Sequence, residues 1–215
     1  MPNRESLKDN VYNRIMEDIF CYEYQAGDIL NEKALMEKYG CSKTPVREAL
    51  LSLCDDQVLK SIPRYGYEII RLTTEDISEM IQFRFLLEGG MLHYNYERLT
   101  GSHFRKLEEI NELIRENSGD VWAHWQYNAQ FHQTLTGFCG NEYALEALTR
   151  CMNRLKRAYA QFYWGKWAQS VPPVDDTRHH VDILNALRAG DPDEAQRCLA
   201  LDLNDFGGLK ISLPV

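Results

Sequence analysis

The sequence lacks any long uninterrupted apolar run. No stretch of the 215 residues approaches the ~18 to 20 apolar residues that a membrane-spanning helix needs. The first residues, Met1 to Glu5, also lack the charged and then apolar order of a signal peptide. We therefore expect a cytoplasmic protein with no membrane partner.

Closely spaced cysteine pairs are missing as well. The six cysteines are scattered along the chain, which predicts free thiols in a reducing compartment rather than a disulfide framework. Neither a Gly-x-Ser-x-Gly nucleophile motif nor a glycine-rich phosphate loop is found. These absences argue against the common enzyme classes, and we expect a protein that is not an enzyme.

An overall excess of basic residues is also lacking. The net charge is −8 over the whole chain, with −2 in residues 1–72 and −6 in residues 73–215. Bulk charge therefore does not indicate a nucleic-acid-binding protein. Five cations of the first 72 residues nevertheless fall within two predicted helices and one predicted hairpin, where a local cationic face is sufficient; they are Lys33, Lys43, Arg47, Lys60 and Arg64.

The stretch from Cys41 to Leu50 predicts a helix whose first turn is presented to a partner. Ser42 or Thr44 can cap this helix, and Pro45 is tolerated in a first turn. Its apolar residues recur at helical spacing at Val46, Ala49, Leu50 and Leu53. A shorter helix over 31–40 precedes it and ends at Gly40. Two helices joined by a glycine turn, with cationic residues opening the second, are typical of a DNA-binding helix-turn-helix.

The flanking segments complete a winged helix. Residues 7–22 predict an amphipathic helix with Val11, Ile15 and Ile19 on one face. Residues 58–62 and 67–71 are β-rich and are joined by the turn-forming residues 63–66. This hairpin is the expected wing.

The run Ser42-Lys43-Thr44 followed by Pro45 to Leu50 resembles the winged-helix motif of GntR-family bacterial transcription regulators, and the resemblance covers about residues 7–72. It implies binding to a double-stranded DNA operator through Lys33, Ser42, Lys43, Thr44, Arg47, Arg64, Tyr65 and Gly66. The chain departs from the family at Lys33 and Lys43, where arginine is usual, and at Gln57, where glycine is usual. Lysine holds a phosphate but cannot make arginine's two-pronged contact to guanine, so the family's usual base contacts do not carry over to these two positions.

The second half of the chain predicts only helices. Thr73 to Asp76 form a capping box, and helical patterns follow over 75–99, 102–117, 120–137, 141–168, 176–189 and 192–206. We therefore predict a mainly α protein with two domains. Residues 1–72 form a winged helix-turn-helix, and residues 73–215 form an all-α antiparallel helix bundle that binds an effector and dimerises.

Several polar residues fall on apolar helix faces of this second domain. Asn128 and His132 are spaced i, i+4 and share one face. His180 opens a helix with a leucine-rich face, and Asp202 lies among leucines, where a buried acid needs a partner. The four residues could converge as a site for zinc, nickel or manganese. Alternatively, the two histidines are hydrogen-bonded core residues with no metal.

A second resemblance covers about residues 73–206. The segments 84–88 and 128–132, with Asn141, His180, Gly190-Asp191 and Ala195, are similar to the FCD effector domain of the FadR subgroup. Many members hold a metal on an Asp or Asn, a histidine four residues later and two further histidines. Asn128, His132 and His180 match this pattern, whereas Asp202 replaces the last histidine. The resemblance implies that Arg84, Asn128, His132, His180 and Asp202 bind the effector; alternatively, Arg84 only pairs with Glu88 along the helix.

Together these patterns predict a homodimeric, ligand-responsive transcription regulator of bacterial metabolism genes. Its effector would be a small organic acid, held by the Arg84 guanidinium and by a divalent metal. Two alternatives concern the helical domain. It could be a metal-dependent hydrolase with a DNA-binding appendage, or a metal-free dimeriser.

Overall fold

The computed structural model describes residues 6–167, 177–206 and 209–213, and they fall into two compact units. The first unit comprises Met1–Thr73 together with Ala160–Trp164, and the second comprises Thr74–Tyr159 and Gly165–Val215. The mainly α fold class, with a winged helix-turn-helix followed by a helix bundle, is confirmed.

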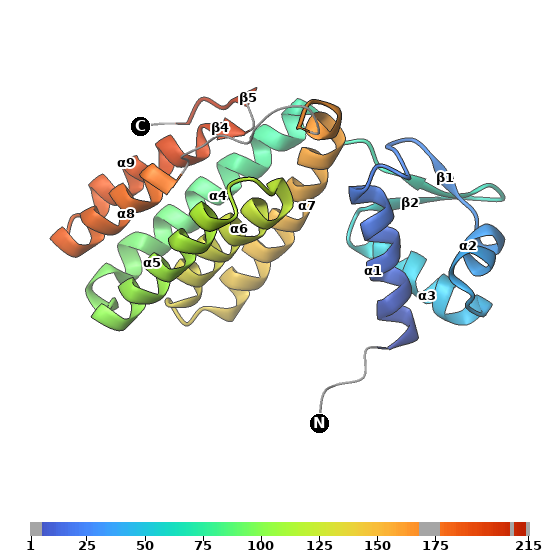
Figure 1. Ribbon diagram of the computed structural model, residues 1–215, viewed down its shortest axis with the longest axis horizontal. Helices are drawn as coiled ribbons and strands as arrows, with labels where there is room; N and C mark the ends of the chain where they lie inside the picture. Colours follow the sequence, from blue (N-terminus) through green and yellow to red (C-terminus); the bar gives the residue numbers. More distant parts are fainter. Residues whose placement is uncertain (1–5, 168–176, 207–208, 214–215) are drawn as a thin grey trace. The chain divides into compact units, whose positions relative to one another are not determined.

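The first unit packs three helices against a small sheet (Figure 1). The helices are α1 (Leu7–Phe20), α2 (Glu32–Tyr39) and α3 (Lys43–Asp55), and the strands are β1 (Ile29–Leu30), β2 (Leu59–Ile62) and β3 (Gly66–Ile69). The antiparallel strand order is β1-β3-β2. The predicted apolar faces form the core, with Val11, Ile15, Leu50 and Leu53 fully buried.

Two glycines have conformational reasons to be present in this unit. Gly40 ends α2 in the left-handed region with φ 65°, which glycine adopts without steric penalty. Gly66 has φ 136°, and a Cβ there would lie 2.4 Å from the carbonyl oxygen of Leu30. The first strand can therefore approach the wing only because residue 66 has no side chain.

The second unit is helical apart from a two-stranded ribbon, and its helices run side by side (Figure 1). They are α4 (Thr74–Asn95), which continues as the 3₁₀ turn η1 (Tyr96–Arg98), α5 (Gly101–Glu116), α6 (Val121–Gly137), α7 (Glu142–Trp167), α8 (Thr177–Ala189) and α9 (Pro192–Leu203). The ribbon pairs β4 (Asp205–Phe206) with β5 (Leu209–Lys210).

Most predicted helix ends lie within two residues of the observed ones, but two do not. The helix predicted over 7–22 ends two residues early, at Phe20, because Tyr22 has a left-handed φ of 64°. The helix predicted to reach residue 99 ends at Asn95 and tightens into η1. The helix predicted to reach residue 206 ends at Leu203, because the backbone then enters the β4–β5 ribbon.

Candidate DNA-binding surface and buried histidine centre

The beginning of α3 is exposed, as a reading helix requires. Ser42 occupies the N-cap, and the side chains of Lys43, Thr44 and Arg47 are exposed, whereas Pro45 is buried in the core beside Val46. The prediction that Ser42 or Thr44 supplies a capping hydrogen bond is wrong, because the Ser42 side chain makes none and Thr44 lies inside the helix. The first-turn N–H groups are therefore not used by the Ser42 hydroxyl and remain suited to an anionic partner.

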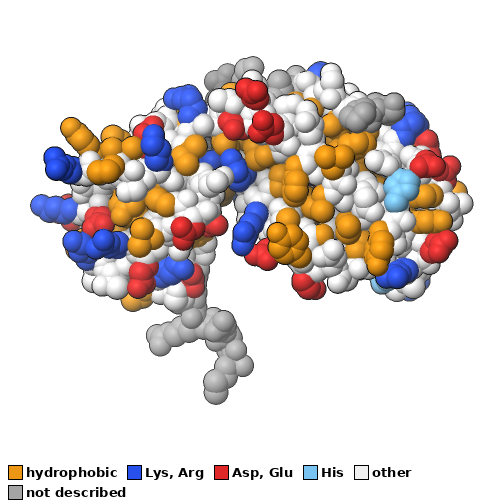
Figure 2. Space-filling model, turned by 180° about the vertical axis from the view of Figure 1, so that it is seen from behind, with side chains coloured by type: hydrophobic (Ala, Val, Ile, Leu, Met, Phe, Trp, Pro, Cys, Tyr) orange, Lys and Arg blue, Asp and Glu red, His pale blue; other side chains and the backbone are white. Residues whose placement is uncertain are grey.

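A groove runs between this helix start and the wing. Five of the predicted DNA-binding residues line it, namely Lys33, Lys43, Arg64, Tyr65 and Gly66. Ser42, Thr44 and Arg47 lie at the start of the same helix but outside the groove lining. Figure 2 shows lysine and arginine side chains gathered at the left edge of the view.

Acidic side chains accompany two of the cations at this surface. The ammonium nitrogen of Lys43 lies 3.7 Å from Glu32, and that of Lys60 lies 3.9 Å from Glu68 across the β2–β3 pair. Both lysines are largely exposed, so these pairs contribute little to stability and can be exchanged for contacts to phosphate. The net charge of −2 in this domain therefore coexists with a local cationic face.

The tip of the wing is conformationally strained. The N–H of Tyr65 donates to the carbonyl of Ile62 at 3.0 Å, which closes a turn with Pro63 and Arg64 at its centre. Arg64 has φ 70°, a left-handed conformation that normally favours glycine or asparagine. A long cationic side chain is thus held in a costly backbone conformation at an exposed position.

The second candidate site is a buried centre within the helix bundle. His132 of α6, His180 of α8 and Asp202 of α9 each offer one ligand atom, and these atoms lie within 4.8 Å of one another. Nε2 of His132 is 3.2 Å from Oδ2 of Asp202, and Nε2 of His180 is 3.6 Å from Oδ1. Asn128 completes the group, with its Nδ2 3.5 Å from His180 Nε2. The structure therefore brings together all four residues that the sequence suggested.

Two further residues of the centre were not predicted as members. Oε2 of Glu88, on α4, lies 2.6 Å from Nδ1 of His132, and Oδ1 of Asn111, on α5, lies 2.9 Å from Nδ1 of His180. Both are buried. Each imidazole is therefore held at Nδ1 by a neighbouring helix while its Nε2 faces Asp202.

Arg84 makes the expected contact with Glu88 along the helix, and its role in effector binding stays a prediction. Its Nε pairs with Oε1 of Glu88 at 2.8 Å, which is the expected contact along the helix. The guanidinium is nevertheless buried, and its Nη2 has no hydrogen-bond partner among the residues described. One face of this cation thus remains for a ligand.

Ionisation in the centre is decided by neighbouring charges rather than by burial. Burial alone would raise the pKa of Glu88 and of Asp202, but Arg84 and His132 beside Glu88, and His180 and His132 beside Asp202, outweigh it and hold each pKa below its ordinary value. Burial would lower the pKa of His132, but the carboxylates of Glu88 and Asp202 raise it overall. The carboxylates are therefore ionised and can only accept hydrogen bonds.

The donor set fits a divalent transition metal. Ionised Glu88 requires the proton of neutral His132 on Nδ1, so the Nε2 lone pair faces another acceptor, the carboxylate of Asp202. Nε2 of His132 is buried, and its one close polar neighbour in the described structure is Oδ2 of Asp202 at 3.2 Å. Two imidazole nitrogens and a carboxylate turned toward one point repel one another unless a proton on His132 or a metal cation lies between them, and they are ligands that zinc, nickel and manganese accept.

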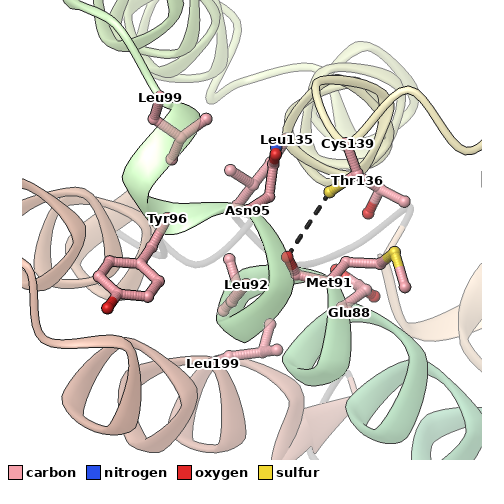
Figure 3. Close-up of a pocket in the computed structure, with 10 residues that line it drawn as sticks. All are labelled: Glu88, Met91, Leu92, Asn95, Tyr96, Leu99, Leu135, Thr136, Cys139 and Leu199. Carbon is pink, nitrogen blue, oxygen red and sulfur yellow. Dashed lines mark hydrogen bonds between the residues drawn. The ribbon is translucent and has the colours of Figure 1, made fainter.

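A small cavity adjoins the centre and shares Glu88 with it. Figure 3 shows that residues of α4, α6 and α9, among them Leu92, Leu135 and Leu199, surround this cavity. Its volume of about 10 Å³ corresponds to a single water molecule. In this conformation the cavity cannot hold an organic acid. The candidate ligand contacts are therefore sought at the neighbouring polar atoms of Arg84 and of the histidine centre.

No helix in the described residues is long and apolar enough to cross a membrane.

Comparison with known proteins gives two family matches along the chain. Residues 7–69 match the bacterial regulatory proteins of the gntR family, and residues 79–205 match the FCD domain. The second match alone covers more than half of the chain.

Several individual proteins are similar to this chain over part or most of its length. The uncharacterized HTH-type transcriptional regulator YdhC of Bacillus subtilis is 31% identical over 137 residues, which are 61% of this chain and 60% of YdhC. A probable D-xylose utilization operon transcriptional repressor of Paenarthrobacter nicotinovorans is 28% identical, over 91% of this chain and 85% of the relative. The solved structure of E. coli McbR/YncC has a TM-score of 0.75 and 23% identity, over 92% of this chain and 93% of that one.

Proposed function

The chain belongs to the gntR family of bacterial transcription regulators and carries an FCD domain, and from this premise we propose how its two domains divide the work. Residues 1–72 bind an operator, and residues 73–215 bind an effector and pair with a second copy in the cytoplasm. Since the family consists of regulators rather than enzymes, the hydrolase alternative is set aside.

The proposed DNA contact places the start of α3 in the major groove. The exposed Lys43, Thr44 and Arg47 would meet bases or phosphates, Ser42 would add a phosphate contact at the helix start, and Lys33 would hold a phosphate. Arg64, Tyr65 and Gly66 would bring the wing tip to the minor groove or to the phosphates. Two copies would read half-sites about one helical turn apart.

Arg47→Ala tests this surface directly. If Arg47 reads a base, operator affinity should fall by at least ~1–3 kcal/mol, measured by gel shift on a duplex selected from a random pool with the wild-type protein. The matched control is Arg105→Ala, which removes an equally charged, exposed side chain from α5 in the other domain. Unchanged affinity in the Arg47 variant would remove the proposed mode of DNA binding.

The proposed effector is a small organic acid bound at the histidine centre. The observation that supports this most directly is a pair of buried polar atoms: Nη2 of Arg84, which has no hydrogen-bond partner among the described residues, and Nε2 of His132, which faces the carboxylate of Asp202 at 3.2 Å. A ligand carboxylate satisfies the first, and a metal satisfies the second. The effector changes DNA binding only if it favours one arrangement of the dimer over another.

The proposed metal is zinc, nickel or manganese, held by His132, His180 and Asp202 with Asn128 at the fourth position. When bound, such an ion supplies a Lewis-acidic point for the carboxylate of the effector. Metal analysis of protein purified without an affinity tag, with a His132→Ala/His180→Ala double variant as control, separates this proposal from a metal-free dimeriser. Equal metal content in the two proteins would refute it.

The proposed dimer uses the outward side of α4. This helix is apolar on both sides, with Ile81 and Phe85 buried, whereas Phe83, Leu86 and Tyr94 are 41%, 71% and 66% exposed. A helix that is apolar all round is normally buried all round, and oligomers of one chain pair such faces by twofold symmetry. Figure 2 shows hydrophobic side chains over a broad area of the bundle. A second copy of this chain would cover this side of α4.

A further inference from the structure

The two imidazoles of the buried centre have chemically different partners at Nδ1. His132 faces a carboxylate, Oε2 of Glu88, at 2.6 Å, whereas His180 faces an amide, Oδ1 of Asn111, at 2.9 Å. An ionised carboxylate can only accept a hydrogen bond, so it holds the Nδ1 proton of His132 in place. An amide presents either an acceptor oxygen or a donor N–H, depending on its rotation.

The surroundings of His180 fix the plane of its ring. The ring stacks on Phe131 with centroids 3.8 Å apart and an interplanar angle of 4°. Its Nε2 lies 3.5 Å from Nδ2 of Asn128 and 3.6 Å from Oδ1 of Asp202. The amide orientations of Asn111 and Asn128 fit one tautomer: Nδ1–H donates to Oδ1 of Asn111, and the lone pair of Nε2 accepts from Nδ2 of Asn128, a hydrogen bond that a bound cation would replace.

Asn111 is not explained by packing. It is 2% exposed on the apolar side of α5, beside Leu107, Ile110 and Ile114. Its Nδ2 has no hydrogen-bond partner among the described residues, and burying an amide nitrogen in this way costs stability. A leucine of similar size would avoid this cost, so the contact with His180 is what the amide contributes.

We propose that Glu88 and Asn111 are positioning residues that turn both Nε2 lone pairs into the metal site, and that Asn111 makes the tautomer of His180 adjustable. With its oxygen toward His180, Asn111 keeps the proton on Nδ1 and frees Nε2 for the metal. After half a turn, its Nδ2–H can donate only to a ring that carries no proton on Nδ1; the ring has then released that proton to water and taken one up at Nε2, and Nε2–H faces Asp202. Metal uptake then requires the first rotamer, a consequence that rests on the proposed metal function.

Two variants of Asn111 have opposite effects if this is right. Asn111→Asp retains only acceptors and should lock the Nδ1–H tautomer, whereas Asn111→Leu removes the partner and should release the Nε2–H form. Two-bond ¹H–¹⁵N correlation spectra of ¹⁵N-histidine-labelled, metal-free full-length protein at about pH 8, where neutral imidazoles bind metal, report the tautomer directly. Circular dichroism confirms folding, and the nearly isosteric leucine variant suffices if the aspartate variant does not fold.

Zinc affinity, measured by competition with a chromophoric chelator, gives the second readout. Asn111→Leu should bind zinc about 10- to 100-fold more weakly, while Asn111→Asp should bind it at least as tightly as wild type, a result that mere loss of structure cannot produce. The visible absorption of the cobalt-loaded proteins should change in the leucine variant, because His180 then coordinates poorly.

The same His180 tautomer in all three proteins, or wild-type zinc affinity with an unchanged cobalt spectrum in Asn111→Leu, would overturn the positioning role. A wild-type protein that binds neither zinc nor cobalt would instead refute the proposed metal site. The tautomer shift in metal-free protein would still support the role of Asn111.

Discussion

Replacing Arg64 with glycine should stabilise the first domain while weakening DNA binding. Arg64 is exposed at the wing tip with φ 70°, and a side chain in this left-handed region costs ~1–2 kcal/mol. Glycine removes that cost but adds ~0.5–1 kcal/mol of chain entropy in the unfolded state. The net gain should be roughly 0.5–1 kcal/mol, which shifts the melting temperature of a domain this small by about 2–8 °C.

The chain contains a matched control for this experiment. Gln57 is also exposed and left-handed, with φ 55°, but it lies after the end of α3 and outside the groove lining. Gln57→Gly should therefore give a similar gain in stability with unchanged affinity for DNA. Arg64→Gly should lose about 1–3 kcal/mol of binding, roughly 5- to 150-fold.

Urea unfolding and melting curves measure the first effect, and gel shifts on a selected operator measure the second. If Arg64→Gly lowers stability, the backbone at the wing tip is not strained. If it binds DNA as tightly as Gln57→Gly does, the strain at residue 64 is not maintained for a DNA contact.

Three other experiments test the close approach of β1 to the wing, the dimer interface and the metal site. Gly66→Ala should destabilise the winged helix by ~2 kcal/mol or more, because its Cβ would meet the carbonyl of Leu30 at 2.4 Å; an unchanged urea midpoint would contradict the close approach of β1 to the wing. Leu86→Asp should convert the dimer into a monomer in light scattering, whereas Leu7→Asp, which alters an equally exposed leucine, should not; a dimer in both variants would place the interface elsewhere. Zinc affinity should fall as the pH is lowered from about 8 to 6, because the raised pKa of His132 keeps a competing proton on its ring to a higher pH; affinity independent of pH, in isothermal titration, would exclude His132 as a ligand.

Local patterns in the sequence were sufficient for the helices and for much of the candidate centre. The i, i+4 spacing of Asn128 and His132, and an acid among leucines at position 202, predicted buried polar residues that needed partners, and the structure places them with His180. Sequence periodicity predicts these buried positions because each helix buries one face, and that face does not depend on which element packs against it.

Contacts between distant segments could not be read in the same way. The i, i+4 spacing of Arg84 and Glu88 explains Glu88 within one helix, so the sequence does not indicate its contact with His132. Asn111 was overlooked, although an amide on a face with Leu107 and Ile110 was a usable signal. The left-handed backbone at Gln57 is indicated in the sequence only by the family resemblance, which implies glycine at this position.

The origin of the histidine centre in five separate helices has a consequence for how occupancy could be detected. The residues that converge come from α4, α5, α6, α8 and α9, so one ion would cross-link most of the bundle at a single point. Backbone amides in all five helices should then exchange with deuterium more slowly together, rather than one segment at a time. In such a regulator, ligand binding would be detectable as a common loss of flexibility in these five helices.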